Sequence, residues 1–220
     1  MAVVHKPPGV CTFAPPGSGG LEGRQSMKCA ISYFVAGAPE GSIGAFWRPK
    51  LVHRLDKGTE GLQVVAKTRH AFKHISNQFA NREVKKRYVA VVEGRVDGEG
   101  GTVEIKIDEK DAVSDWTVIE RSQAAEYGGN HLTTLELCPH HGRTHQLRIH
   151  CYQGLGCSIV GDRRYRAKAC DAGMLLAAVG IKLNHPETQD ILEINIPEPS
   201  RFVDFKTAQA ELAEKTRHEV

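Results

Sequence analysis

The feature that most limits the possible folds of this chain is a succession of short strand-like segments in which helices are rare. Residues 103–107 alternate apolar and charged side chains, the pattern of a strand with one buried face. Similar short segments lie at residues 88–92, 115–119, 132–137, 175–183 and 192–196. Strands that follow one another without a crossover helix pair antiparallel. The sequence therefore predicts an α+β fold, a largely antiparallel mixed sheet with flanking helices.

The first half of the chain supplies most of the predicted helices. Residues 27–34 carry apolar side chains at helical spacing, and Thr68 can cap a second helix whose apolar face includes Ile75. A third helix is expected over residues 144–152, before the glycines at 154 and 156. Short strands are expected at residues 3–4 and 62–66, and loops at residues 14–24 and 38–49.

The bulk composition fits an ordinary globular protein. The chain has 220 residues, of which 40% are hydrophobic and 25% charged, and we expect one domain over residues 1–205 and a polar tail over residues 206–220. No apolar run approaches membrane-spanning length. Six cysteines without a C-x-x-C pair favour reduced thiols, which predicts a cytoplasmic protein. The net charge of +3 permits a nucleic-acid partner.

The stretch from Leu51 to Gly61 concentrates polar side chains between two apolar segments. It contains the tetrapeptide HRLD, in which Asp56 is followed by a glycine-bearing loop. A carboxylate on a loop between two strands is a candidate nucleophile or base, since loops carry chemistry and strands hold them in place. Taken alone, the tetrapeptide is better explained as an exposed turn. His53 is expected to hydrogen-bond the loop.

Three further stretches accompany this one along the chain, namely residues 5–9 (HKPPG), 85–94 (KKRYVAVVEG) and 142–150 (GRTHQLRIH). In order and spacing, the four stretches resemble the RluA family of pseudouridine synthases, and the resemblance covers about residues 3–205. It implies the pseudouridine synthase fold, with a catalytic cleft across the middle of the sheet. It also implies an isomerase that converts a uridine of ribosomal or transfer RNA to pseudouridine and needs neither a metal nor another cofactor. We expect it to act as a monomer.

The resemblance assigns a role to each of five residues. Asp56 is the nucleophile, attacking either C6 of uracil or C1′ of the ribose. Arg148 is the cation that keeps this carboxylate ionised in a dry cleft. Tyr88 stacks on the uracil and handles a proton, and Leu176 lies beneath the base. Arg54 fills the space that the extruded uridine leaves, because guanidinium planes stack on bases.

Basic side chains precede the expected strand at 88–92. Lys85 and Lys86, together with Arg82 and Arg87, are predicted to border the RNA, although a solvated run of charges is an equal alternative. The chain also departs from the family pattern. Glu60 replaces a serine, residues 173–178 (GMLLAA) replace R-Q-x-L-H-A, and the strand that usually comes before residue 3 is missing.

Two other functions compete with this interpretation. The departures would suit an RNA-binding protein of the same fold that has lost catalysis. A zinc enzyme could instead use the nearby cysteines and histidines, since His141 and His145 have the spacing of ligands on one helix face. The second alternative lacks the glutamate of H-E-x-x-H, and Gly142 weakens a helix there. Its complete candidate set is Cys138, His140, His141, His145, His150 and Cys151.

Overall fold

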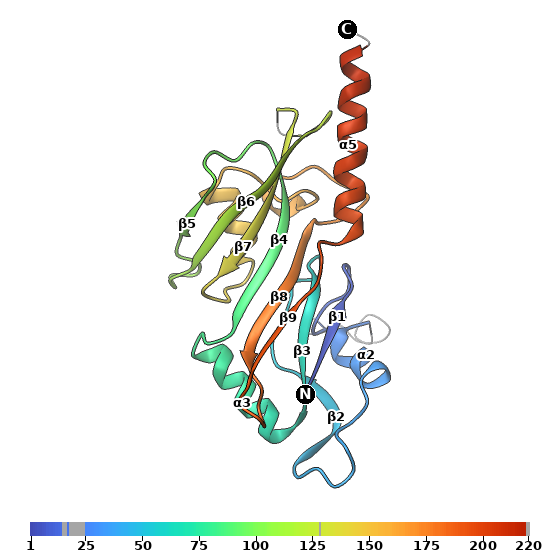
Figure 1. The fold of residues 1–220 in the computed structure, drawn as a ribbon, viewed down its shortest axis with the longest axis vertical. Coiled ribbons are helices and arrows are strands. Elements are labelled where there is room, and N and C mark those ends of the chain that lie inside the picture. The colour runs from blue at the N-terminus through green and yellow to red at the C-terminus, as the bar shows by residue number, and fades with distance from the viewer. Residues whose placement is uncertain (15–16, 18–24, 128, 219–220) are drawn as a thin grey trace. The chain divides into compact units, whose positions relative to one another are not determined.

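The computed structural model describes residues 1–14, 17, 25–127 and 129–218 (Figure 1). Most of the predicted loop at residues 14–24, and one glycine of the turn at 128–130, lie outside the described residues. The chain forms two compact units. Unit 1 comprises Met1–Lys85 and Gly180–Asn195, and unit 2 comprises Lys86–Val179 and Ile196–Val220.

Unit 1 is built around β3 (Glu60–Thr68), which is buried along almost its whole length. Strand β1 (Ala2–Lys6) pairs with β3 antiparallel and ends where Pro7 begins, since proline cannot donate to a sheet. Strand β2 (Ala45–Leu51) also pairs with β3, and β9 (Ile191–Asn195) pairs antiparallel with β8 (Leu176–Asn184). The predicted strands at 3–4, 62–66 and 192–196 are confirmed.

The predicted loop at residues 38–49 is wrong in its second part, because β2 begins at Ala45. Pro49 obscured this strand in the sequence. The pairing of β2 with β3 is irregular between Ala45 and Lys50, and such irregularities are where a sheet tolerates proline.

Two helices cover parts of unit 1, as predicted. Helix α2 (Met27–Phe34) buries Met27 and Ile31 in a cluster with Leu51 and Val65. Helix α3 (Arg69–Ala80) begins after Thr68, whose Oγ1 accepts a hydrogen bond of 3.1 Å from the backbone N–H of Ala71. Its side chain Gln78 makes two hydrogen bonds, of 2.8 and 2.9 Å, to the backbone of Asn184 at the end of β8.

Unit 2 contains a meander of antiparallel strands. Strand β4 (Lys85–Glu93) pairs with β7 (His131–Pro139), β7 with β6 (Val113–Gln123), and β6 with β5 (Gly100–Glu104). The β4–β7 register places Tyr88 opposite Leu137. These pairings confirm the largely antiparallel sheet.

Two element boundaries in unit 2 differ from the prediction. The alternating segment 103–107 is a strand only as far as Glu104. Asp108 and Glu109 have positive φ angles of 49° and 59°, which form a tight turn closed by hydrogen bonds between Ile107 and Lys110. The predicted helix 144–152 is α4 (Gln146–Ile149) continued by a single π-helical turn (His150–Gly154).

Both faces of the central part of strand β4 are covered, which explains the apolar run at residues 89–92. Ala90 and Val92 belong to one core cluster with Leu147 from α4. Val89 and Val91 belong to a second cluster, which includes Phe202 from α5 (Ser200–His218). Helix α5 thus begins before the predicted polar tail 206–220 and continues into it. No helix of the described chain is long and apolar enough to span a membrane.

Candidate active site

The HRLD loop of unit 1 is fixed by a buried threonine from a distant part of the chain. Thr12 Oγ1 accepts a hydrogen bond of 3.0 Å from Leu55 N–H and donates one of 2.8 Å to the Leu55 carbonyl. The side chain of Gln63, on β3, donates to the same hydroxyl at 3.1 Å. Leu55 is 4% exposed. The residue directly before Asp56 is therefore held on both of its backbone polar groups.

His53 ties the same loop to β3 and to α3. The backbone N–H of Val64 donates to His53 Nε2 at 2.9 Å, so this nitrogen carries the lone pair and the ring is neutral. The imidazole also stacks on Phe79, with ring centroids 4.7 Å apart and an angle of 22° between the planes. The sequence predicts a hydrogen bond from His53 to the loop; in the structure the ring accepts one from strand β3 and so anchors the loop that carries it.

A buried lysine lies beneath the residues that follow Asp56. Lys6 has no exposed surface, and its ammonium group donates to the carbonyls of Pro7 at 2.8 Å and Lys57 at 3.2 Å. Burial lowers the pKa of Lys6 to about 8, while the negative charges of Asp56 and Glu60 act in the opposite direction. Glu60, the departure from the family serine, is 5% exposed, so its carboxylate lies in the interior near Lys6.

The two predicted site residues of the loop differ in exposure. Asp56 is half-buried, and its carbonyl accepts a 3.2 Å hydrogen bond from Thr59 N–H, which closes a turn after the carboxylate. Arg54 is exposed, and its side chain makes no hydrogen bond or ion pair to the described residues. This guanidinium is accessible from solvent.

Unit 2 brings Tyr88, Leu176 and the helix bearing Arg148 to one core cluster. Leu176 is 3% exposed within it, beside Leu147 of α4, and the half-buried ring of Tyr88 packs against it. The apolar surroundings predicted for Tyr88 and Leu176 are therefore present in one unit.

The GRTHQLR stretch forms a turn that orients α4. His145 has a positive φ of 57° immediately before the helix. Gln146 is buried and locks the turn, since its amide donates to Val113 O and Ser114 Oγ, both at 2.9 Å. Its carbonyl oxygen accepts from Arg143 N–H at 3.1 Å.

Arg148 is held in place by a carboxylate that the sequence reasoning missed. Its Nε and Nη2 donate to the two oxygens of Asp162 at 2.6 and 2.7 Å, a planar fork in which Asp162 is 2% exposed. The guanidinium also lies over the ring of Tyr165, 5.1 Å from its centroid. The Tyr165 hydroxyl is 3.0 Å from Nδ1 of His145. No spacing rule in the sequence links these residues.

The altered stretch 173–178 is supported by an arginine from another element. Gly173 stands where the family pattern has an arginine. Arg201, on α5, donates to the carbonyls of Ala172 and Met174 on either side of Gly173. The guanidinium of Arg201 on α5 therefore lies beside the segment that leads into Leu176.

The basic residues near β4 are only partly available to a ligand. Lys85 is exposed, whereas Lys86 is half-buried and donates to the carbonyl of His141 at 3.1 Å. Arg87 pairs with Glu136 at 3.2 Å. Contact of this run with RNA remains a prediction.

Three of the four histidines of the zinc alternative have separate partners. His140 contacts Asp115 at 2.6 Å, His141 accepts from Val113 N–H at 3.1 Å, and His145 contacts Tyr165. His141 lies outside α4, so the helical spacing with His145 is not realised. Among the described residues, no three histidine, cysteine or acidic side chains form a group that could hold a metal.

The predicted site residues thus fall into two sets. Arg54 and Asp56 lie on one fixed loop of unit 1. Tyr88, Arg148 and Leu176 belong to unit 2. The pairing of Asp56 with Arg148 stays a prediction.

Comparison with known proteins agrees with these motifs. Residues 1–153 match the RNA pseudouridylate synthase family. Uncharacterized RNA pseudouridine synthases of Aquifex aeolicus and Bacillus subtilis are 30% and 32% identical, over 92% and 93% of this chain and 68% of each relative. The dual-specificity RNA pseudouridine synthase RluA of Pasteurella multocida is 33% identical over 66% of this chain and 71% of that protein.

The fold has the same relatives. The solved structure of human RNA pseudouridylate synthase domain containing 4 superimposes with a TM-score of 0.69 at 22% identity, covering 91% of this chain and 86% of that one. With the family match over residues 1–153 and relatives of 30% and 32% identity along more than nine tenths of the chain, this protein belongs to the RluA family of RNA pseudouridylate synthases.

Proposed function

We propose that this protein isomerises a uridine of structured ribosomal or transfer RNA to pseudouridine, with Asp56 as the nucleophile. The observation that carries the proposal is the Asp56 loop. This loop presents a half-buried carboxylate. Thr12 holds both the N–H and the carbonyl of Leu55, the residue before Asp56. The ammonium group of Lys6 lies beneath the loop. Such fixation suits a nucleophile, because positioning in a near-attack geometry contributes strongly to rate.

The reaction breaks the N1–C1′ bond of the uridine, turns the uracil and rejoins it through C5. Asp56 supplies the electron pair for the covalent step and leaves again when the C5 bond is complete, so no external reagent is consumed. We assign Arg148 as the partner that keeps Asp56 ionised.

Three further side chains have roles around the base. Tyr88 would stack on the uracil and remove or deliver a proton through its hydroxyl. Leu176 would form part of the apolar floor. Arg54, exposed on the loop, would occupy the space vacated by the extruded uridine.

The first test is conversion of uridine to pseudouridine in RNA by the purified protein without added cofactor, read by tritium release or chemical mapping. Asp56→Asn should abolish turnover while RNA affinity and the unfolding temperature stay near the wild-type values. Asp204→Asn, on the exposed face of α5, removes the same charge and is the matched control. An Asp56→Asn variant with wild-type turnover would exclude this nucleophile. Specific RNA binding without any turnover by the wild-type protein would favour the non-catalytic alternative.

The second test concerns Tyr88. Replacement by phenylalanine keeps the ring and removes only the hydroxyl, so RNA binding should survive while turnover falls by about 10²-fold or more. Equal losses of turnover and of affinity would show that Tyr88 is structural.

We also infer that the protein works as a monomer in the cytoplasm. All six cysteines are free thiols in the structure, as a reducing compartment requires. Light scattering of the active protein, and localisation of a tagged copy in cells, test the two points.

A further inference from the structure

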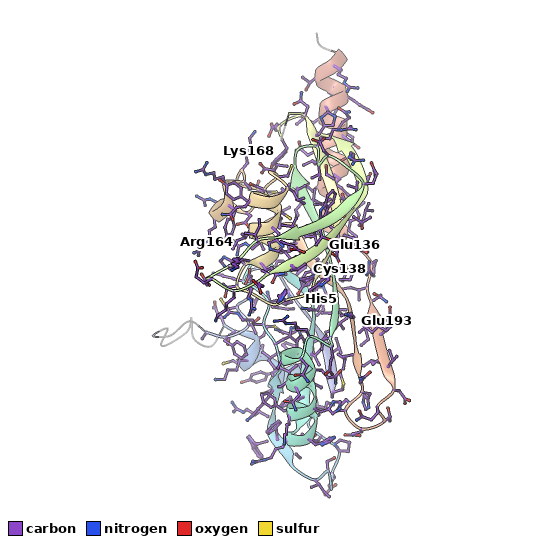
Figure 2. All side chains as sticks on the ribbon, turned by 90° about the vertical axis from the view of Figure 1, so that its left-hand side faces the viewer. His5, Glu136, Cys138, Arg164, Lys168 and Glu193 are labelled. Carbon is purple, nitrogen blue, oxygen red and sulfur yellow. The ribbon has the colours of Figure 1, made fainter. Side chains whose placement is uncertain are left out.

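A second basic segment lies in unit 2, separate in sequence from the basic run at residues 82–87. It is the segment from Arg163 to Lys168, here called the basic turn, which begins with a short 3-10 helix (Arg163–Tyr165). Arg163, Arg164, Arg166 and Lys168 are all exposed. Figure 2 marks Arg164 and Lys168, whose side chains lie at the margin of unit 2. The basic turn holds four cationic side chains within six positions, as many as residues 82–87, and unlike that run it contains no acidic residue.

The charges of the three arginines are not neutralised by any residue in the described part of the chain. None of these guanidinium groups makes a hydrogen bond or ion pair to the described residues. The carboxylate next to them, Asp162, is already used by Arg148. Lys168 differs, because its ammonium group donates to the carbonyl of Glu126. The unmatched charge of the basic turn thus resides on its arginines.

Arg166 adds an independent observation. It ends the 3-10 helix with a φ of 66°, a left-handed conformation that glycine adopts without strain and other residues adopt at a cost. Its guanidinium lies 5.9 Å from the centroid of the Tyr152 ring, a weak contact at this exposed position. Neither packing nor ion pairing therefore explains an arginine here. A strained residue of this kind points to a function outside the fold.

The basic turn is joined directly to the support of Arg148. Asp162, which holds Arg148, is the residue before Arg163, and Tyr165, whose ring lies beneath Arg148, is part of the turn. The arginines that would bind a ligand are therefore sequence neighbours of Asp162 and Tyr165, the two residues that position Arg148.

We propose that the basic turn is a phosphate-binding surface that holds the backbone of the substrate RNA through Arg163, Arg164 and Arg166. This inference rests on the proposed function for the identity of the ligand. Guanidinium groups bind phosphate oxygens through paired hydrogen bonds, and contacts of this kind fix the register of a nucleic acid without reading its sequence.

The test is the salt dependence of RNA affinity. Each lost phosphate contact lowers the slope of log affinity against log salt by about 0.7 to 0.9. The triple variant Arg163→Gln, Arg164→Gln, Arg166→Gly should therefore have a slope smaller by about 2 to 3. Between 50 and 200 mM salt it should lose roughly 20- to 60-fold less affinity than the wild-type protein. The control variant Lys106→Gln, Lys110→Gln, Lys215→Gln removes the same charge from exposed positions of unit 2.

Equal slopes for the two triple variants would overturn the proposal, because net charge alone would then account for the effect. Turnover of the wild-type protein is measured separately. Absence of pseudouridine formation would count against the proposed function, whereas a slope that depends on the basic turn would still support this inference.

Arg166→Gly provides the sharpest single comparison. If the arginine is retained for RNA, glycine should relieve the left-handed strain and raise the unfolding temperature by about 1 to 4 °C. RNA affinity should fall at the same time, with a slope lower by about 0.7 to 0.9. An unchanged affinity would refute the role of Arg166. A lower unfolding temperature would show that the arginine serves the fold and would equally refute it.

Discussion

Replacement of Asp162 by asparagine tests the support of Arg148. The substitution keeps the shape of the side chain but removes the charge and turns one acceptor into a donor that faces the guanidinium. Breaking a buried ion pair from one side destabilises a protein by about 3–5 kcal/mol. Since 11% of the Arg148 side chain remains exposed, we expect the lower end, about 3 kcal/mol. For a chain of this size the unfolding temperature should fall by about 6 to 12 °C.

Urea unfolding followed by circular dichroism measures this free energy. The matched control is Glu193→Gln, which breaks the ion pair of 2.9 Å with Lys182, whose two side chains are 47% and 50% exposed. Solvent screens such a pair, and the expected loss is about 0–1 kcal/mol. If Asp162→Asn destabilised the protein no more than Glu193→Gln, the fork would not be an important support.

The Arg148→Met background separates charge pairing from shape. There Asp162 is a buried carboxylate without its fork partner, so Asp162→Asn should be neutral or stabilising instead of destabilising. The same loss in both backgrounds would refute the reasoning. In the wild-type background, single-turnover pseudouridine formation should also fall by about 10²-fold, because a guanidinium displaced by about 1 Å no longer positions its partner.

Three other perturbations have defined outcomes. Folding lowers the pKa of Lys6 from 10.5 to about 8. Between pH 8 and 10.5 the unfolded chain therefore binds more protons than the folded protein, so the free energy of unfolding rises with pH in this range. Wild-type protein should therefore gain up to about 3 kcal/mol relative to Lys6→Met from pH 7 to 10 in urea unfolding, and parallel pH profiles would contradict this. Arg54→Ala should lose at least about tenfold more single-turnover activity on a stacked target uridine than on an unstacked one, because only the former needs a side chain to replace it; equal losses would exclude that role. Gly161→Ala should destabilise the protein by at least about 2 kcal/mol more than Gly156→Ala. Both glycines have positive φ, but only a Cβ at Gly161 would overlap the Gly173 carbonyl. Similar unfolding free energies for the two variants would refute the clash.

The strand and helix pattern could be predicted where local chemistry decides it. Thr68 caps α3 as expected, and the apolar run of β4 reflects burial on both faces. The errors occur where the backbone departs from a regular period. The alternation through Ile107 suggested a longer strand, but the left-handed conformations of Asp108 and Glu109 end it, and neither residue is a glycine that would have marked the turn.

The supports of the candidate site were harder to predict than its reactive groups. Asp56 and Arg148 belong to recognisable motifs, whereas Thr12 and Asp162 act through contacts with residues 43 and 14 positions away. A hydroxyl or a carboxylate in a loop has many potential partners in sequence. Only the fold selects one of them.

The two sets of site residues are each supported within their own unit. On the Asp56 side, Thr12, Gln63 and Lys6 hold the loop through neutral hydrogen bonds and one buried ammonium group. On the Arg148 side, Asp162 supplies a full opposing charge. The Arg148 cation is thus already partly compensated within its own unit. Under the proposed function, the guanidinium assigned to Asp56 would therefore stabilise the ionised carboxylate without binding it so tightly that attack on the base is suppressed, since only interactions that strengthen toward the transition state accelerate the reaction.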